Sequence, residues 1–299
     1  MKVLIIGYGS MGRRHAANAA ASGHDVAVYD PALSAVPAAD DVKGFRCRTE
    51  QDAWDWGPSA IVVASPASTH VRWLWEASSR ADAVFVEKPL GLSIADLSRD
   101  GVSFAEAYAM AGHQVRIQVG CNWRFHPLVC EFRRRLTEAH GMARQAIFWI
   151  QADDRTWPGQ GYADTLLEMG AHEIDLALWF FGPATLASAE RLRDGTAWRI
   201  ALRHAAGSTS TVVLDGRAAK PSRGLRVQWD GWDGGYDVPA ADPRTPEALA
   251  VSYARELRYF LDTAAGLVPP DYEGSPRPAT LADGMAVLRI IDEVRRMAC

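Results

Sequence analysis

The sequence predicts an α/β protein in which a doubly wound parallel sheet is followed by an α+β domain built on an open, mainly antiparallel sheet. Two observations predict it. Strand and helix patterns alternate over the first 120 residues, and such alternation gives right-handed crossovers between parallel strands. Further on, three strand patterns follow one another without an intervening helix. We expect two domains, 1–120 and 121–299, and the last helix is a candidate to pack back on the first domain.

Short apolar runs mark the strands of the first domain, as expected for parallel strands that are covered on both faces. Ser93 is a reasonable N-cap for a long helix. The strands are expected at 3–6, 25–30, 59–64, 83–86 and 116–120, and helices at 70–80 and 93–111.

The second domain begins with a helix and continues with strands. A Pro/Gly-rich loop at 268–278 separates its two closing helices. Helices are expected at 166–181, 253–265 and 281–297, and strands at 199–203, 208–214 and 225–229.

Composition limits the class of protein. An apolar share of 48% and a charged share of 23% are typical of a globular chain, and a net charge of −4 gives no reason to expect nucleic acid. No apolar run reaches the ~18 residues of a membrane span, and glycines cut the first run too short for a signal peptide. The cysteines show no metal or redox spacing, so we expect a reduced, cytoplasmic setting.

A glycine-rich turn follows the first strand and opens a helix. Gly7 permits a tight turn, Gly9 allows close approach of a pyrophosphate, and Gly12 allows the helix to pack on the sheet. The helix N-terminus offers free N–H groups to phosphates. Asp30 ends the second strand, where a carboxylate can accept both ribose hydroxyls. The turn predicts a dinucleotide site formed by Gly7, Gly9, Ser10, Met11, Gly12 and Asp30.

Two further loops follow strands at the edge of the sheet where ligands bind in such folds. One contains Ser65 and Pro66 with His70 shortly after, and the other contains Glu87 and Lys88 before a proline. Beside a bound nicotinamide, Lys88 would be partly desolvated, which favours proton exchange near neutral pH. A surface lysine that ends a strand explains its position equally well. Ser65, Pro66, His70, Glu87 and Lys88 are all predicted to lie at the cofactor.

The helix at 166–181 places Glu168, His172 and Asp175 on one face, because they are four and three residues apart. A face with acids and an imidazole but no Lys or Arg favours a polar site over a solvated surface. A metal site is a third alternative, since Glu and His at this spacing can bind a metal together. No further ligand follows at suitable spacing, so we predict no metal.

The junction of the two domains is the expected place for a small substrate. Asn122 and Arg124 lie there, and Arg124 can either anchor a substrate oxygen or pair with a structural carboxylate. Trp157 and Tyr162 belong to a loop of acids and aromatics, a combination that suits sugar rings. The predicted substrate contacts are therefore Asn122, Arg124, Trp157, Tyr162 and Asp175.

Taken together, these segments resemble the glucose-fructose oxidoreductase/inositol dehydrogenase family, Gfo/Idh/MocA, over nearly the whole chain. The ordered Glu-Lys-Pro and acid-x-Gly-x-His-x-x-Asp elements are its more specific part. The resemblance rests on the glycine turn followed by Arg13-Arg14-His15, on Ser65-Pro66 with His70, on Glu87-Lys88-Pro89, on the segment 122–127 and on the helix 168–175.

The resemblance implies a Rossmann domain that binds NAD, with NADP as the alternative, and hydride transfer at a secondary alcohol of a sugar, cyclitol or sugar derivative. Members associated with sugar-nucleotide pathways look most similar. It implies that Lys88 is the general acid/base and that His172 assists proton transfer. Glu168 stands where the family usually has aspartate, and it is counted with the catalytic residues.

Two other functions remain open at this point. Some relatives hold NAD tightly and run a redox-neutral cycle, such as glycosidic bond cleavage. A non-catalytic NAD-binding sensor or scaffold is the third alternative. We expect no nucleic-acid or membrane partner. An open sheet needs a cover on one face, so we expect a homodimer or homotetramer formed through the C-terminal sheet.

Overall fold

The computed structural model describes residues 1–34, 44–110, 115–138, 143–153, 164–229, 232–238, 246–267 and 277–298. These residues form two compact units. The N-terminal unit comprises the described parts of Met1–Asn122, Tyr253–Asp271 and Pro278–Gly284. The C-terminal unit comprises those of Trp123–Ser252, Tyr272–Arg277 and Met285–Cys299.

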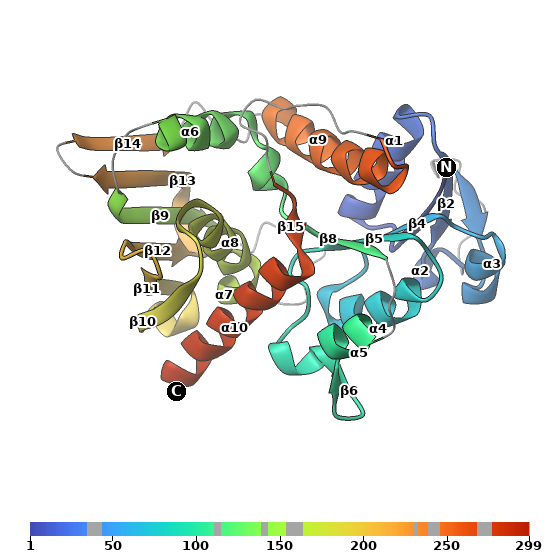
Figure 1. Cartoon of the computed structure of the whole chain (residues 1–299), viewed down its shortest axis with the longest axis horizontal. Helices are drawn as coiled ribbons and strands as arrows, with labels where there is room; N and C mark the ends of the chain where they lie inside the picture. The colour runs from blue at the N-terminus through green and yellow to red at the C-terminus, as the bar shows by residue number, and fades with distance from the viewer. Residues whose placement is uncertain are drawn as a thin grey trace. The chain divides into compact units, whose positions relative to one another are not determined.

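The N-terminal unit is built on a seven-stranded sheet with the order β15-β8-β5-β4-β1-β2-β3 (Figure 1). All neighbouring strands are parallel except β15, which pairs antiparallel with β8. The strands are β1 (Lys2–Ile6), β2 (Asp25–Tyr29), β3 (Phe45–Cys47), β4 (Ala60–Val63), β5 (Ala83–Glu87), β8 (Arg116–Gly120) and β15 (Ala279–Thr280). The predicted parallel, doubly wound domain is therefore confirmed.

Helices follow most strands of this sheet. β1 leads into α1 (Ser10–Ala21), and β4 leads into α4 (Ala67–Ser78). A helix from much later in the chain also belongs to this core, because Leu257 and Phe260 cluster with Val3, Val62 and Phe85. The other helices of the unit are α2 (Pro31–Ser34), α3 (Glu50–Asp55), α5 (Phe104–Met110) and most of α9 (Pro246–Ala264).

The predicted helix at 93–111 is wrong over its first half. Ser93 does cap a helix, through a capping box with Asp96, but this is the short 3₁₀ helix η1 (Ile94–Leu97). A hairpin of β6 (Ser98–Arg99) and β7 (Val102–Ser103) then precedes α5. Asp100 and Gly101 form its turn with φ of 53° and 78°. Asp-Gly favours such two-residue hairpin turns, and the helical pattern obscured this signal.

The C-terminal unit contains a six-stranded sheet with the order β10-β11-β12-β9-β13-β14. Only the β12–β9 pair is parallel, so the predicted open, mainly antiparallel sheet is confirmed. Its strands are β9 (Ala143–Asp153), β10 (Ala184–Leu192), β11 (Ala197–His204), β12 (Thr209–Asp215), β13 (Arg217–Trp229) and β14 (Trp232–Val238). The helical elements are η2 (Asn122–Phe125), α6 (Pro127–Glu138), α7 (Thr165–Glu168), α8 (Gly170–Phe181), η4 (Arg193–Gly195) and α10 (Leu281–Met297), of which α10 begins in the N-terminal unit.

Several boundaries differ from the prediction. The predicted helix at 166–181 is two helices, α7 and α8, with Met169 between them, and α9 begins at Pro246 rather than 253. Proline is favoured in the first turn of a helix, so Pro246 fits this earlier start. The sequence analysis also missed β9. Its outward Ile147 is 46% exposed while Phe148 is buried, and apolar residues on both faces hide the alternation of a strand.

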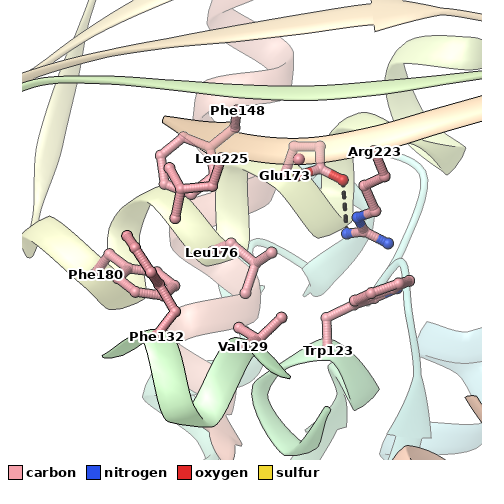
Figure 2. Close-up of a pocket in the computed structure, with 10 residues that line it drawn as sticks. Trp123, Val129, Phe132, Phe148, Glu173, Leu176, Phe180, Arg223 and Leu225 are labelled. Atoms are coloured by element: carbon pink, nitrogen blue, oxygen red, sulfur yellow. Dashed lines mark ion pairs between the residues drawn. The ribbon is translucent and has the colours of Figure 1, made fainter. Parts of the chain in front are cut away.

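The packing of α8 on the sheet involves a buried ion pair. Glu173 Oε1 lies 2.6 Å from Arg223 Nη2, and the guanidinium stacks 3.5 Å from the centroid of the Trp123 ring (Figure 2). These three residues border a cavity of about 20 Å³ whose remaining lining includes Phe132 and Phe148. Such a volume holds a single water at most, so it is a packing defect of the core and too small for a sugar.

Burial raises the pKa of Glu173 to about 7, against the attraction of Arg223. The folded chain therefore keeps this proton to a higher pH than the unfolded chain does. The contribution of this proton to the free energy of unfolding is fully present below about pH 4.3, the usual glutamate pKa. It is lost as the pH rises to about 7.

We therefore expect the difference in unfolding free energy between the wild type and Glu173→Gln to fall from pH 4.5 to pH 7.5, because the glutamine does not titrate. Urea denaturation at several pH values across this range measures it. A difference that is constant with pH would contradict the assignment.

Candidate active site

The glycine turn between β1 and α1 is tightly packed on one side and open on the other. Gly7 has a φ of +91°, and a side chain there would lie 2.6 Å from the backbone of Ser65. A Cβ on Gly12 would lie 1.9 Å from the Gly7 carbonyl oxygen. A Cβ on Gly9, in contrast, would meet no heavy atom within 4 Å among the described residues. The turn thus leaves open space at Gly9, directly before the N-terminus of α1.

Asp30 fixes this turn through its carboxylate. Its two oxygens accept hydrogen bonds from the backbone N–H groups of Tyr8, at 2.6 Å, and Ala32, at 2.8 Å. Asp30 is half-buried, so its oxygens retain accessible lone pairs for further donors. Ser10 is exposed and Met11 half-buried in the first turn of α1, and Gly9 gives the helix no side-chain cap. An open loop, uncapped helix amides and an acid at the end of β2 are the features that a dinucleotide requires.

The loop after β4 is held by His70. This buried imidazole lies 2.7 Å from the Ser65 carbonyl oxygen through Nε2 and 2.7 Å from the Pro89 carbonyl oxygen through Nδ1. Burial lowers the pKa of His70, while the two carbonyl groups oppose that shift. Ser65 is half-buried and Pro66 exposed, so they can face a ligand, whereas the His70 ring atoms face the protein. The predicted contact between His70 and the cofactor stays a prediction.

The loop after β5 contains the predicted general acid/base. Lys88 is half-buried and is followed by a cis peptide bond to Pro89. Glu87 is buried, and its Oε1 lies 2.7 Å from His15 Nε2 on α1. Its Oε2 accepts a hydrogen bond of 3.2 Å from the Lys88 backbone N–H. Both carboxylate oxygens of Glu87 are thus directed to the chain itself.

The three loops lie at one edge of the sheet, because β5, β4 and β1 are neighbours in it. The register pairs Ile6 with Val63 and Val63 with Val86, so the three strands end at the same level. The glycine turn, Ser65 and Lys88 follow directly. The structure therefore brings the predicted cofactor residues of the N-terminal unit to one edge. Asn122, also predicted at the substrate, is buried at the end of this unit.

In the C-terminal unit, Glu168 ends α7 and His172 lies in the first turn of α8, and both are half-buried. Asp175 lies on the same helix but is buried, and it accepts hydrogen bonds of 2.5 and 2.8 Å from the fully buried Arg124. Of the alternatives for Arg124, the geometry favours the pair with a structural carboxylate. Trp157 and Tyr162 lie outside the described residues.

Two residues that the sequence analysis did not select take part in this arrangement. His15 contacts Glu87, and Arg223 lies 2.6 Å from Glu173 in the core of the C-terminal unit. The signal for His15 was present, since it follows Gly12 by three residues and so lies on the first turns of α1. Nothing in the sequence around Arg223 indicates its partner. Across the described stretches of the chain, no cluster of three or more potential metal ligands occurs, and no helix is long and apolar enough to cross a membrane.

Comparisons with known proteins agree with this geometry. The family described as "Oxidoreductase family, NAD-binding Rossmann fold", GFO_IDH_MocA, matches residues 1–113. The rhizopine catabolism protein MocA of Rhizobium meliloti is 27% identical over 310 residues, which cover 96% of this chain and 92% of that protein. Inositol 2-dehydrogenase 4 of Saccharopolyspora erythraea is 30% identical over 207 residues, or 66% of this chain and 59% of that one.

Among solved structures, a myo-inositol dehydrogenase from Corynebacterium glutamicum has the same fold. It superposes with a TM-score of 0.79 at 19% identity, over 100% of this chain and 96% of that one. The residues matched by the family include the glycine turn and the loops after β4 and β5. Residues 1–113 match the NAD-binding Rossmann domain of the Gfo/Idh/MocA oxidoreductase family, and 96% of this chain is similar to the MocA protein of Rhizobium meliloti.

Proposed function

We propose that this protein is an NAD-dependent dehydrogenase that acts on a secondary alcohol of a sugar, a cyclitol or a related sugar derivative. The match of residues 1–113 to an oxidoreductase family supports the redox class, and similarity to relatives named for inositol oxidation or rhizopine catabolism supports a polyhydroxylated substrate. The observation that carries the proposal most directly is the position of Lys88. It follows β5 at the sheet edge that also holds the glycine turn and Ser65, where ligands of open α/β sheets bind.

The roles follow from the chemistry of the side chains. NAD, when bound, accepts the hydride from the substrate carbon. Lys88 takes the proton of the reacting hydroxyl and returns it in the reverse direction. His172 holds the same oxygen, and Glu168 orients the imidazole or the substrate. Arg124 and Asp175 are not proposed to touch the substrate, because they pair with each other and both are buried. The remaining proposed substrate contacts are the predicted ones, Asn122, Trp157 and Tyr162.

The predicted self-association through the C-terminal sheet belongs to the same proposal. Ile147 is exposed on β9, and its cross-strand neighbours Thr211 and Arg226 present a mixed apolar and polar face. A face of this kind suits a second copy of the chain, and the oligomeric state in solution tests it.

Replacing Lys88 tests the proposed chemistry. A screen of sugars, inositols and sugar nucleotides, followed by NADH fluorescence, first identifies a substrate. We expect Lys88→Ala to lower turnover by about 10²–10⁴-fold, the usual worth of a general acid/base, with NADH affinity nearly unchanged. Lys220→Ala, at an exposed lysine on β13, is the matched control and should leave turnover unchanged. Retained turnover in Lys88→Ala would refute the role, and turnover without net NADH formation would favour the redox-neutral cycle.

Asp30 should set the preference for NAD over NADP, because its carboxylate repels a 2′-phosphate. We expect Asp30→Asn to reduce the preference by about tenfold or more, as one lost charge repulsion of ~1.4 kcal/mol would. Asparagine keeps only one of the two oxygens that accept from the Tyr8 and Ala32 backbone N–H groups, so the ratio of the two cofactor affinities, rather than either affinity alone, isolates the effect of the charge. Fluorescence titrations with NADH and NADPH measure both affinities. Tighter binding of NADPH to the wild type would overturn the assignment.

A further inference from the structure

We propose that two buried histidines, His15 and His70, are positioning residues that hold the backbone on either side of Lys88. The inference rests on the proposed role of Lys88 as general acid/base and adds what keeps it in place. His15 belongs to α1 and His70 to α4, the helices that follow β1 and β4. Each contacts a direct sequence neighbour of the lysine.

The first of these contacts comes from α1. His15 is completely buried, and its Nε2 lies 2.7 Å from Glu87 Oε1. An ionised carboxylate only accepts, so Nε2 must be the donor. The His15 Nδ1 has no hydrogen-bond partner within the described part of the chain, which fits a neutral ring with its proton on Nε2. The other oxygen of Glu87 receives the Lys88 N–H. A continuous path of hydrogen bonds thus runs from α1 to the lysine backbone.

The second contact comes from α4 and engages the residue after the lysine. His70 is 1% exposed, and both of its nitrogens face carbonyl oxygens, of Pro89 and of Ser65. The ring therefore lies between the loop after β4 and the loop after β5, and with one proton it donates to one of the two carbonyl oxygens. Among the nearby charges, Glu87 raises the pKa of His70 and Lys88 lowers it.

These two contacts connect the backbone around Lys88 to the elements that form the predicted dinucleotide site. The N-terminus of α1 lies beside the open side of the glycine turn, and Ser65 packs against Gly7. His15 and His70 are attached to those same elements. A lysine side chain has several rotatable bonds, so a fixed backbone limits the positions that its ammonium group can reach. A misplacement of about 1 Å at a reacting group can cost ~10²-fold in rate.

A purely structural role would also bury these histidines, so the test needs a readout at Lys88 itself. The chain contains only four lysines: Lys2, Lys43, Lys88 and Lys220. Reductive methylation with ¹³C-formaldehyde labels them for NMR, and Lys88→Arg identifies the Lys88 signal. The experiment uses the full chain with NAD⁺ added and compares the shift and pH titration of that signal with kcat, KM and NADH affinity.

We expect His15→Leu to move the Lys88 signal and its titration midpoint and to lower kcat by about 10²-fold, with KM and NADH affinity changed far less. His15→Gln, which keeps a donor, should recover most of the loss. His70→Leu should act in the same direction. His204→Leu is the matched control, because His204 is also buried and engages Gly182 and Ser210 through both ring nitrogens, but in the sheet of the C-terminal unit. It should leave the Lys88 signal and kcat per folded molecule unchanged.

An unmoved Lys88 signal together with wild-type kcat in His15→Leu and His70→Leu would overturn the inference, as would an equal loss of kcat in His204→Leu. If His15→Leu does not fold, Glu87→Gln takes its place, because it keeps the side-chain volume and removes the charged acceptor. The failure of the proposed function is a separate result. In that case Lys88→Ala retains turnover, while the Lys88 signal still reports whether the histidines hold the backbone.

Discussion

The in-register pairing of β5, β4 and β1 is the constraint on which the site of the N-terminal unit depends. Ile6, Val63 and Val86 form one row across these strands, so each strand delivers its next residues to the same level. Hydrogen-bonded parallel strands lie about 4.8 Å apart, which brings the three loops within the span of one small ligand. A slip of one residue in β5 would turn Lys88 to the other face of the sheet. The fully buried side chains of these strands prevent that slip.

Buried charges specify the C-terminal unit in a different way. Arg124 pairs with Asp175, and Arg223 pairs with Glu173, so both acids that flank Ile174 on α8 are engaged by arginines from other elements. Such pairs add little net stability, because taking the charges out of water offsets their attraction. Removing one partner is costly, however, since it leaves a buried charge alone. The two pairs therefore set the rotation of α8 about its axis, and this fixes which face His172 occupies.

The sequence predicted the elements whose pattern has a single explanation. The sequence analysis predicted five strands in the first domain, and all of them formed, because buried parallel strands are short, mainly apolar runs. Their predicted ranges are 3–6, 25–30, 59–64, 83–86 and 116–120. The hairpin at Asp100 was missed because its strands are only two residues long and helical spacing continued around it. At the site, motif positions such as Gly12, Asp30 and Lys88 could be named in advance. The partners of Glu87 and Glu173 could not, because His15 and Arg223 reach them through contacts that are distant in sequence.

The place of α9 in the N-terminal core has a consequence for how the chain folds as it is made. Phe260 packs against Phe85 with ring centroids 5.6 Å apart, and Leu257 and Leu261 join the same cluster. On the ribosome, the first sheet cannot pack against this helix until the entire C-terminal sheet has been synthesised. During that interval one apolar surface of the nascent nucleotide-binding half lacks its cover, which makes it the natural target for a chaperone and the point of greatest risk of aggregation.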